Sequence, residues 1–286
     1  MNVKVLGVGS IGVYLIHALT EGNHSVSVLD PRLMTNPRIL DAQINSESRT
    51  INVESFHQIT KTDELIVVTL KSYQIDSKIF SMLIESGKEV LFLQNGISRY
   101  LSCDKEIERI HFGTILGIQA HKVGETTFIN TQNCSIAIIP GTENTQIQLL
   151  SKSLSNNTLH FARWEKSKTI YFEKFLRWFV ASLVSSIQRK TLGESLVEIN
   201  DNDLDMLINT LVEIVAVESQ ISISVESIRF ALSNLPPDLL TSAARDFFNS
   251  KQNEMQVELD YLIDRSRVLK LDSDVLKYWK ERLINV

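Results

Sequence analysis

The glycine-rich stretch near the start of the chain limits the possible folds more than any other feature. Gly7, Gly9 and Gly12 have the spacing G-x-G-x-x-G, directly after the strand-like run VKVL and at the start of an amphipathic helical stretch that ends at Gly22. A second strand-like run, SVSVLD, follows. This order of strand, turn, helix and strand predicts a βαβ unit that binds a dinucleotide, rather than an isolated glycine turn.

Each glycine has its own physical reason in such a unit. Gly7 permits the tight turn, Gly9 lets a pyrophosphate approach the backbone, and Gly12 lets the helix pack close to the strand. The N–H groups at the start of the helix, from Ser10 and Ile11 onward, then face the phosphates. We therefore predict that these five residues bind the cofactor.

The first half of the chain alternates short β-branched runs with helical stretches up to about residue 160. The runs VKVLGV, SVSVLD, ELIVVTL and EVLFLQN are nearly all apolar, as expected for parallel strands covered on both faces by helices. The later runs HFGTILGIQAHKV, TTFIN and CSIAIIPG indicate an antiparallel extension at the edge. The pattern predicts an α/β protein whose first domain, residues 1–163, is a Rossmann-like doubly wound sheet.

The second half lacks strand signals. Apolar residues recur at helical spacing, for example at Phe175, Phe179 and Leu183. The segment NLPPD, Asn234 to Asp238, is the strongest helix breaker and predicts the end of one helix and the start of another. We predict an all-helical second domain, residues 164–286, that carries substrate and homodimer surfaces.

Composition and charge narrow the class of function. The 29 basic and 34 acidic residues give a net charge of -5, which does not favour nucleic acid as a partner. The apolar stretch around Arg177 falls short of the ~18 uncharged residues that cross a bilayer. With no leader pattern after Met1, we expect a cytoplasmic protein without a membrane partner. Cys103 and Cys134 lie far apart and the histidines are scattered, so we expect no metal site.

The end of the second predicted strand bears on the choice between NADH and NADPH. Asp30 lies 18 residues after Gly12, where a carboxylate accepts hydrogen bonds from a free ribose and repels a 2′-phosphate, which favours NADH. Arg32 would pair with a 2′-phosphate, which favours NADPH. Alternatively, Asp30 only caps a loop before Pro31.

Four further stretches follow the glycine motif in order: VTLKSYQ with Lys71, LFLQNGIS with Asn95, YFEKFL with Lys174 and VELDYL with Glu258. Together with the two-domain organisation, they resemble the ketopantoate reductase (2-dehydropantoate 2-reductase) family over nearly the whole chain. The resemblance implies reduction of 2-dehydropantoate to pantoate with NADPH, on the route to pantothenate and coenzyme A. It makes a small 2-oxo acid the expected partner.

The chemistry requires a proton donor and a cation near the carbonyl oxygen, because hydride transfer builds negative charge there. Lys174 begins a strongly apolar helical run, where partial desolvation suits that role. Its match to the family's catalytic lysine implies that it is the general acid. The alternative is an ordinary surface lysine beside Glu173.

Two polar residues end neighbouring predicted strands, at the edge of the sheet where ligands of open α/β folds bind. A cation at Lys71 suits a cofactor phosphate or a substrate carboxylate. The Asn95 amide both donates and accepts, as the positioning of ribose and substrate hydroxyls requires. The alternatives are a solvated Lys71 and a plain turn at Asn95–Gly96.

The resemblance also assigns residues near the C-terminus. Glu258 takes the place of the acidic residue that holds the substrate's hydroxyl and orients the lysine. Glu254 lies one turn earlier on the same predicted face and becomes the working carboxylate if the register slips by a turn. Ser242, in TSAARD, takes the place of the serine that contacts the substrate carboxylate.

The chain departs from the family beside Lys174. The positions one and two turns further on usually carry asparagines that line the substrate pocket, and here they are Trp178 and Ser182. Ser182 replaces one hydrogen bond, whereas Trp178 brings a large ring with one donor and no acceptor. This predicts either a pocket shaped for a different 2-oxo acid or a substrate held by other groups. A dinucleotide-binding protein without turnover is the further alternative.

Overall fold

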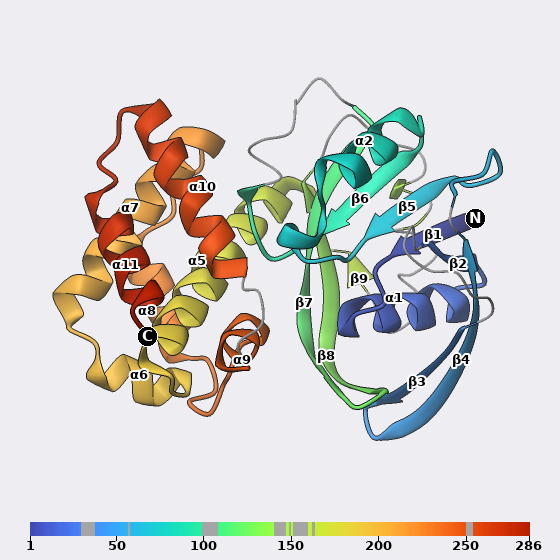
Figure 1. The fold of residues 1–286 in the computed structure, drawn as a ribbon, viewed down its shortest axis with the longest axis horizontal. Helices are drawn as coiled ribbons and strands as arrows, with labels where there is room; N and C mark the ends of the chain where they lie inside the picture. Colours follow the sequence, from blue (N-terminus) through green and yellow to red (C-terminus); the bar gives the residue numbers. More distant parts are fainter. Residues whose placement is uncertain are drawn as a thin grey trace. The chain divides into compact units, whose positions relative to one another are not determined.

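The computed structural model describes residues 1–29, 38–56, 58–98, 108–139, 147–148, 150, 160–161, 164–249 and 254–286. The chain divides into two compact units. The first combines Met1–Gln94 with Asp104–Tyr171, and the second combines Asn95–Cys103 with Phe172–Val286. Figure 1 labels the helices and strands of both.

A nine-stranded sheet forms the first unit. Its centre has four parallel strands in the order β2-β1-β5-β6, with bounds Ser25–Leu29, Asn2–Leu6, Leu65–Val68 and Glu89–Leu93. All four residues of β5 are buried, which explains why such strands read as uninterrupted apolar runs. The centre of the sheet confirms the predicted Rossmann-like arrangement.

The edges of the sheet are two antiparallel hairpins. One pairs β3 (Arg38–Ile44) with β4 (Glu47–Phe56), and the other pairs β7 (Ile110–Val123) with β8 (Thr126–Ile139). The short strand β9 (His160–Phe161) adds to β8. Strand β3 also pairs with β8 in parallel, so the sheet closes on itself and does not stay open as a simple doubly wound sheet does.

Two differences from the predicted strands have physical reasons. Strands β3 and β4 are not among those predicted, because β4 is mostly polar and only Ile51, Val53 and Ser55 are buried, at every second position. The run TTFIN and the described part of CSIAIIPG, up to Ile139, belong to one continuous strand, β8, although polar residues separate them.

Helix α1 (Ser10–Glu21) packs against β1, β2, β7 and β8. Figure 1 shows it beside the two hairpins. Val13, Tyr14, Leu15 and Ile16 follow one another along the helix and are each at most 2% exposed. A helix that is apolar on several sides needs cover on several sides, and the closed sheet supplies it.

The second unit is helical in its described part, as predicted. Its helices are α5 (Trp164–Gln188, which begins in the first unit), α6 (Leu192–Glu198), α7 (Asp201–Ser219), α8 (Val225–Ser233), α9 (Ser242–Phe248), α10 (Glu254–Leu269) and α11 (Asp274–Ile284). The predicted break at NLPPD falls between α8 and α9. Helix α5 forms the core, since Phe172, Leu176 and Phe179 are fully buried. No described helix is long and apolar enough to cross a membrane.

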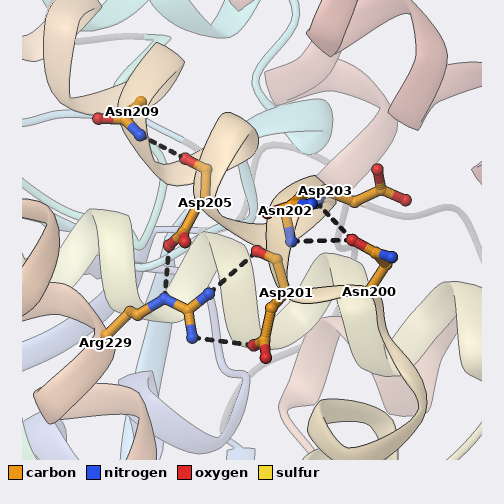
Figure 2. A network of polar contacts seen from close by, with 7 residues as sticks. All are labelled: Asn200, Asp201, Asn202, Asp203, Asp205, Asn209 and Arg229. Atoms are coloured by element: carbon orange, nitrogen blue, oxygen red, sulfur yellow. Dashed lines mark hydrogen bonds and ion pairs between the residues drawn. The ribbon is translucent and has the colours of Figure 1, made fainter.

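An ion-pair network joins α7 to α8 in the second unit. Arg229 of α8 donates from Nε to Asp205 and from Nη1 to Asp201 at 3.0 Å (Figure 2). Asn200 caps α7 by accepting from the backbone N–H of Asn202 at 2.8 Å. The hydrogen bond with Asp205 is the main reason that the pKa of Arg229 is raised. All these groups are accessible to water, so the network contributes about 1 kcal/mol or less and has a structural role.

A buried ion pair in the first unit yields a stability prediction. Lys4 of β1 is 2% exposed, and its Nζ lies 3.4 Å from Asp63 Oδ1 and 4.1 Å from the centre of the Phe56 ring. Lys4→Met leaves the Asp63 carboxylate buried without its cation. We expect the free energy of unfolding, measured by urea denaturation, to fall by about 3 kcal/mol.

Two further variants test the cause. Lys4→Met combined with Asp63→Asn removes both charges and should recover more than half of the loss. Lys88→Met, at a lysine whose bond to the Lys61 carbonyl is exposed, should change the free energy of unfolding by about 0.5 kcal/mol at most. A Lys4→Met variant that is as stable as the unchanged protein would contradict the prediction.

Candidate active site

The glycine turn lies where β1 and β5 end side by side. Thr69, directly after β5, donates its backbone N–H to the Leu6 carbonyl at 2.9 Å and its hydroxyl to the Gly7 carbonyl at 2.8 Å. Gly7 has φ +114°, and a Cβ there would lie 2.9 Å from the backbone nitrogen of Leu70. The turn therefore requires glycine at position 7 on both conformational and steric grounds.

The other two glycines have different surroundings. A Cβ on Gly12 would lie 1.9 Å from the Gly7 carbonyl oxygen, so α1 can pack against the turn only with glycine there. At Gly9 no described atom lies within 4 Å of the Cβ position, and no side chain caps the first turn of α1, which starts at Ser10 and Ile11. The open space and the uncapped N–H groups suit the pyrophosphate of a dinucleotide.

Lys71 lies at the same edge of the sheet, three residues after β5 ends. Its backbone N–H donates to Gln74 Oε1 at 3.0 Å, at the start of the short 3-10 helix η1 (Ser72–Gln74). Gln94, directly after β6, donates to the Leu70 carbonyl at 2.6 Å. The bond between Gln94 and Leu70 links the carboxyl ends of β5 and β6. Asp30 and Arg32 lie outside the described residues, so their effect on cofactor choice stays a prediction.

In the second unit, Lys174 and Asn95 are in direct contact. Lys174 Nζ donates to Asn95 Oδ1 at 3.1 Å, although the two residues lie 79 positions apart in the chain. The predicted proton donor and the predicted amide therefore share one site.

The carboxylate of Glu258 belongs to the same region. Glu258 lies in α10 and is 0% exposed. Its Oε2 accepts from the backbone N–H groups of Ile97 and Ser98, both at 3.1 Å, and its Oε1 accepts from the Ser98 hydroxyl at 2.7 Å. A Cβ on Gly96 would lie 2.0 Å from Glu258 Oε1, so glycine is needed for this approach. The structure thus brings the Asn95–Ser98 segment, Lys174 and Glu258 together.

Ser98 was not predicted as a site residue. A weak signal was present, because Ser98 is the last residue of the stretch LFLQNGIS that contains Asn95. Nothing in the sequence indicated that its hydroxyl would pair with a carboxylate 160 residues away.

The neighbours of Glu258 on α10 bear on the alternative carboxylate. Glu254, one turn earlier, is 5% exposed. Burial raises the pKa of the Tyr261 phenol to about 12, and the charge of Glu258 acts in the same direction. Arg265 pairs with Glu218 of α7. Glu258 contacts the Asn95–Ser98 segment. The choice between Glu254 and Glu258 as the working carboxylate stays a prediction.

A second polar contact joins α5 to α9. Ser182 is 0% exposed, and its hydroxyl donates to Thr241 Oγ1 at 2.8 Å. Thr241 in turn caps α9 by accepting from the backbone N–H of Ala244 at 3.2 Å. Ser242, the first residue of α9, is partly exposed. Thr241 was not predicted; it bonds to Ser182 and directly precedes Ser242 in the chain.

The described part of the chain contains no cluster of side chains that could bind a metal ion. There, no group of three or more histidine, cysteine, aspartate and glutamate side chains lies together as metal ligands would.

A glycine turn at the edge of a parallel sheet is typical of dinucleotide-binding α/β folds, and the first unit has this arrangement. A model of the family described as "Ketopantoate reductase PanE/ApbA" matches residues 3–141. This part of the chain therefore belongs to the ketopantoate reductase family, which confirms the family predicted from the sequence. No curated protein sequence matches the chain.

Solved structures share the fold over the whole chain. A D-mandelate dehydrogenase solved with NADH and anilino(oxo)acetate has a TM-score of 0.81 at 16% identity, covering 100% of this chain and 98% of its own. A dimeric ketopantoate reductase from Staphylococcus aureus has a TM-score of 0.78 at 13% identity, covering 100% and 99%. A 2-dehydropantoate 2-reductase from Geobacter metallireducens has a TM-score of 0.75 at 14% identity, again covering 100% and 99%.

Two alanine variants separate the geometry of the turn from cofactor binding. Gly9→Ala places a methyl group in open space, so we expect the affinity for NADH and NADPH to fall about tenfold or more while stability changes by about 0.5 kcal/mol at most. Gly12→Ala forces a backbone clash and should lower the free energy of unfolding by about 2 kcal/mol. Fluorescence titration and urea denaturation measure the two effects. A Gly9→Ala variant that binds both cofactors normally would contradict the predicted site.

The hydrogen bonds to Glu258 give a second prediction. Ser98→Ala removes the hydroxyl donor from a buried carboxylate and should lower the free energy of unfolding by about 1–2 kcal/mol. Ser227→Ala, at an exposed serine that bonds only locally to the Ser224 carbonyl, is the matched control and should change it by about 0.5 kcal/mol at most. Equal effects of the two variants in thermal and urea unfolding would show that the bond to Glu258 adds nothing.

Proposed function

We propose that this protein is a nicotinamide-dependent reductase of 2-oxo acids in which Lys174 is the proton donor. The observation that supports this most is the 3.1 Å hydrogen bond between Lys174 Nζ and Asn95 Oδ1. It gives the ammonium group a fixed direction in a partly buried position. Bound NADH or NADPH would supply the hydride.

Lys174 serves two purposes in this proposal. Its positive charge stabilises the negative charge that develops on the carbonyl oxygen, and its proton neutralises the resulting alkoxide. An ammonium group has three N–H donors, so a bond to Asn95 is compatible with donation to the substrate oxygen. Asn95 positions the ammonium group and contacts the cofactor ribose.

The remaining site residues position groups around this lysine. Glu258 places a negative charge in the same region and orients Lys174, as its bonds to the Asn95–Ser98 segment suggest. Ser242 binds the substrate carboxylate. Ser182 supports Ser242 through Thr241, because its own hydroxyl bonds to that residue.

The two parts of the chain have different tasks in the proposal. Residues 1–163 bind the cofactor through the glycine turn and Lys71, and residues 164–286 supply the substrate site and a homodimer surface. The resemblance to the family implies NADPH, whereas the D-mandelate dehydrogenase of similar fold was solved with NADH. The dimeric reductase from Staphylococcus aureus supports a dimer.

2-Dehydropantoate is the first substrate to test, because the family and several similar structures are named for it. Its reduction to pantoate would serve the synthesis of pantothenate and coenzyme A in the cytoplasm.

The decisive variant is Lys174→Ala. It removes both the cation and the proton donor, so we expect kcat for 2-oxo acid reduction to fall by about 1,000-fold or more. The affinity for the cofactor should stay within about threefold. Lys166→Ala, at an exposed lysine two turns earlier on α5, is the matched control and should leave kcat unchanged.

The assay follows oxidation of NADPH and of NADH with 2-dehydropantoate, 3,3-dimethyl-2-oxobutanoate and phenylglyoxylate. Tight cofactor binding without oxidation in the presence of any of these acids would contradict the proposal and favour a dinucleotide-binding protein without turnover. Full activity of Lys174→Ala would contradict the role of the lysine.

A further inference from the structure

Trp178 presents carbon atoms, rather than a hydrogen-bonding group, on the Lys174 side of α5. It lies one helical turn beyond Lys174 on the same face of the helix. The residue is partly exposed, but its Nε1 is buried and has no hydrogen-bond partner in the described structure. What a ligand can reach is therefore the apolar part of the indole ring.

Ser182, one turn further on, is equally unable to serve a ligand. The residue is 0% exposed, and its hydroxyl donates to Thr241 Oγ1 at 2.8 Å. Thr241 is itself committed as the cap of α9. A ligand hydroxyl would have to break this link between two helices to reach Ser182.

Glu258 is also committed to protein partners. It is 0% exposed, and both of its carboxylate oxygens accept hydrogen bonds from the Ile97–Ser98 segment. A ligand hydroxyl gains a bond here only by displacing a donor from a buried charge, which is unfavourable.

Polar and apolar groups are therefore separated around Lys174. Lys174 and Asn95 suit the 2-oxo acid group, which every candidate substrate shares. Trp178 and Ser182 follow Lys174 on the same face of α5, and Glu258 bonds to the segment that contains Asn95. Each of the three is either apolar where it is accessible or already bonded to the protein. A buried hydroxyl without a partner lowers affinity, whereas a methyl or phenyl group gains by packing on an indole ring.

We infer that this site selects 2-oxo acids with an apolar side chain, branched or aromatic, and that Trp178 determines the selection. The inference rests on the proposed reductase function and names the substrate class of that same site. The neighbouring hydroxyl and carboxylate contribute by staying bonded to the protein.

A matched pair of substrates tests this directly. 2-Dehydropantoate and 3,3-dimethyl-2-oxobutanoate share the branched 2-oxo acid skeleton and differ by one hydroxyl group. We expect the kcat/KM of the unchanged protein to be about tenfold or more higher for 3,3-dimethyl-2-oxobutanoate than for 2-dehydropantoate. The hydroxyl group of 2-dehydropantoate finds no partner in the site, which makes this compound the poorer ligand. Phenylglyoxylate should also be reduced. A ratio below tenfold would overturn the inference.

Two variants connect the preference to Trp178. Trp178→Asn offers an amide donor and acceptor in place of carbon. We expect it to lower the ratio of kcat/KM for 3,3-dimethyl-2-oxobutanoate to kcat/KM for 2-dehydropantoate about tenfold or more. Trp178→Phe keeps an apolar ring without the N–H and should preserve the ratio. An unchanged ratio in Trp178→Asn, or a ratio that Trp178→Phe shifts as far as Trp178→Asn does, would overturn the assignment to the ring's apolar surface.

The outcomes distinguish this inference from the function on which it rests. Reduction of 2-oxo acids with a preference for 2-dehydropantoate would contradict the inference and leave the proposed reductase intact. The absence of turnover with all three acids, in protein that binds cofactor, would contradict the proposed function and the inference together. Cofactor affinity and unfolding temperature close to those of the unchanged protein show that each variant is folded.

Discussion

The buried carboxylate of Glu258 is the interaction on which the arrangement of the candidate site depends. A charge removed from water is unfavourable unless hydrogen bonds replace those it loses. Here the replacements are two backbone N–H groups and one hydroxyl, all from Ile97 and Ser98. Because Asn95 belongs to the same short segment, the bonds that satisfy the carboxylate also hold the amide that accepts from Lys174. The absence of a side chain at Gly96 is a condition of this geometry, since a Cβ would meet the carboxylate at 2.0 Å.

The glycine turn of the first unit follows a related principle. Gly7 and Gly12 are needed because backbone atoms of the protein approach them closely, whereas the space beside Gly9 is open. Gly7 and Gly12 thus shape the turn, and Gly9 leaves space in which a ligand can approach the backbone. Around Lys174 the division is chemical rather than steric. Polar groups meet at Asn95, while the next turn of α5 offers the carbon surface of Trp178. The protein therefore combines a turn suited to an anionic cofactor with a site that is polar at one end.

Local patterns were sufficient for the centre of the sheet and for the helical second unit. Strands β5 and β6 are buried along nearly their whole length, so their sequences are almost uninterrupted apolar runs and easily recognised. In β1 and β2, valine and leucine alternate with Lys4 or with serines, and the strands remain recognisable. Strands β3 and β4 were missed because a mostly polar hairpin becomes a strand pair only through its neighbours: β4 pairs with β2, and β3 pairs with β8. Helix α1 shows the same limit. Its apolar residues predicted a buried helix, but only the closure of the sheet explains why several sides of it are covered.

For the candidate site, the sequence by itself supplied the residue types and their order, which resemble the ketopantoate reductase family: the glycine turn, Lys71, Asn95, Lys174 and Glu258. It did not determine which groups are committed to one another. Ser98 and Thr241 became part of the site description only through hydrogen bonds to Glu258 and Ser182, over separations of 160 and 59 residues. Hydrogen bonding and burial depend on which atoms meet after folding, and spacing along the chain carries that information only within a single helix or strand. The tertiary structure alone decided that Ser182 and Glu258 serve protein partners and that Trp178 presents carbon.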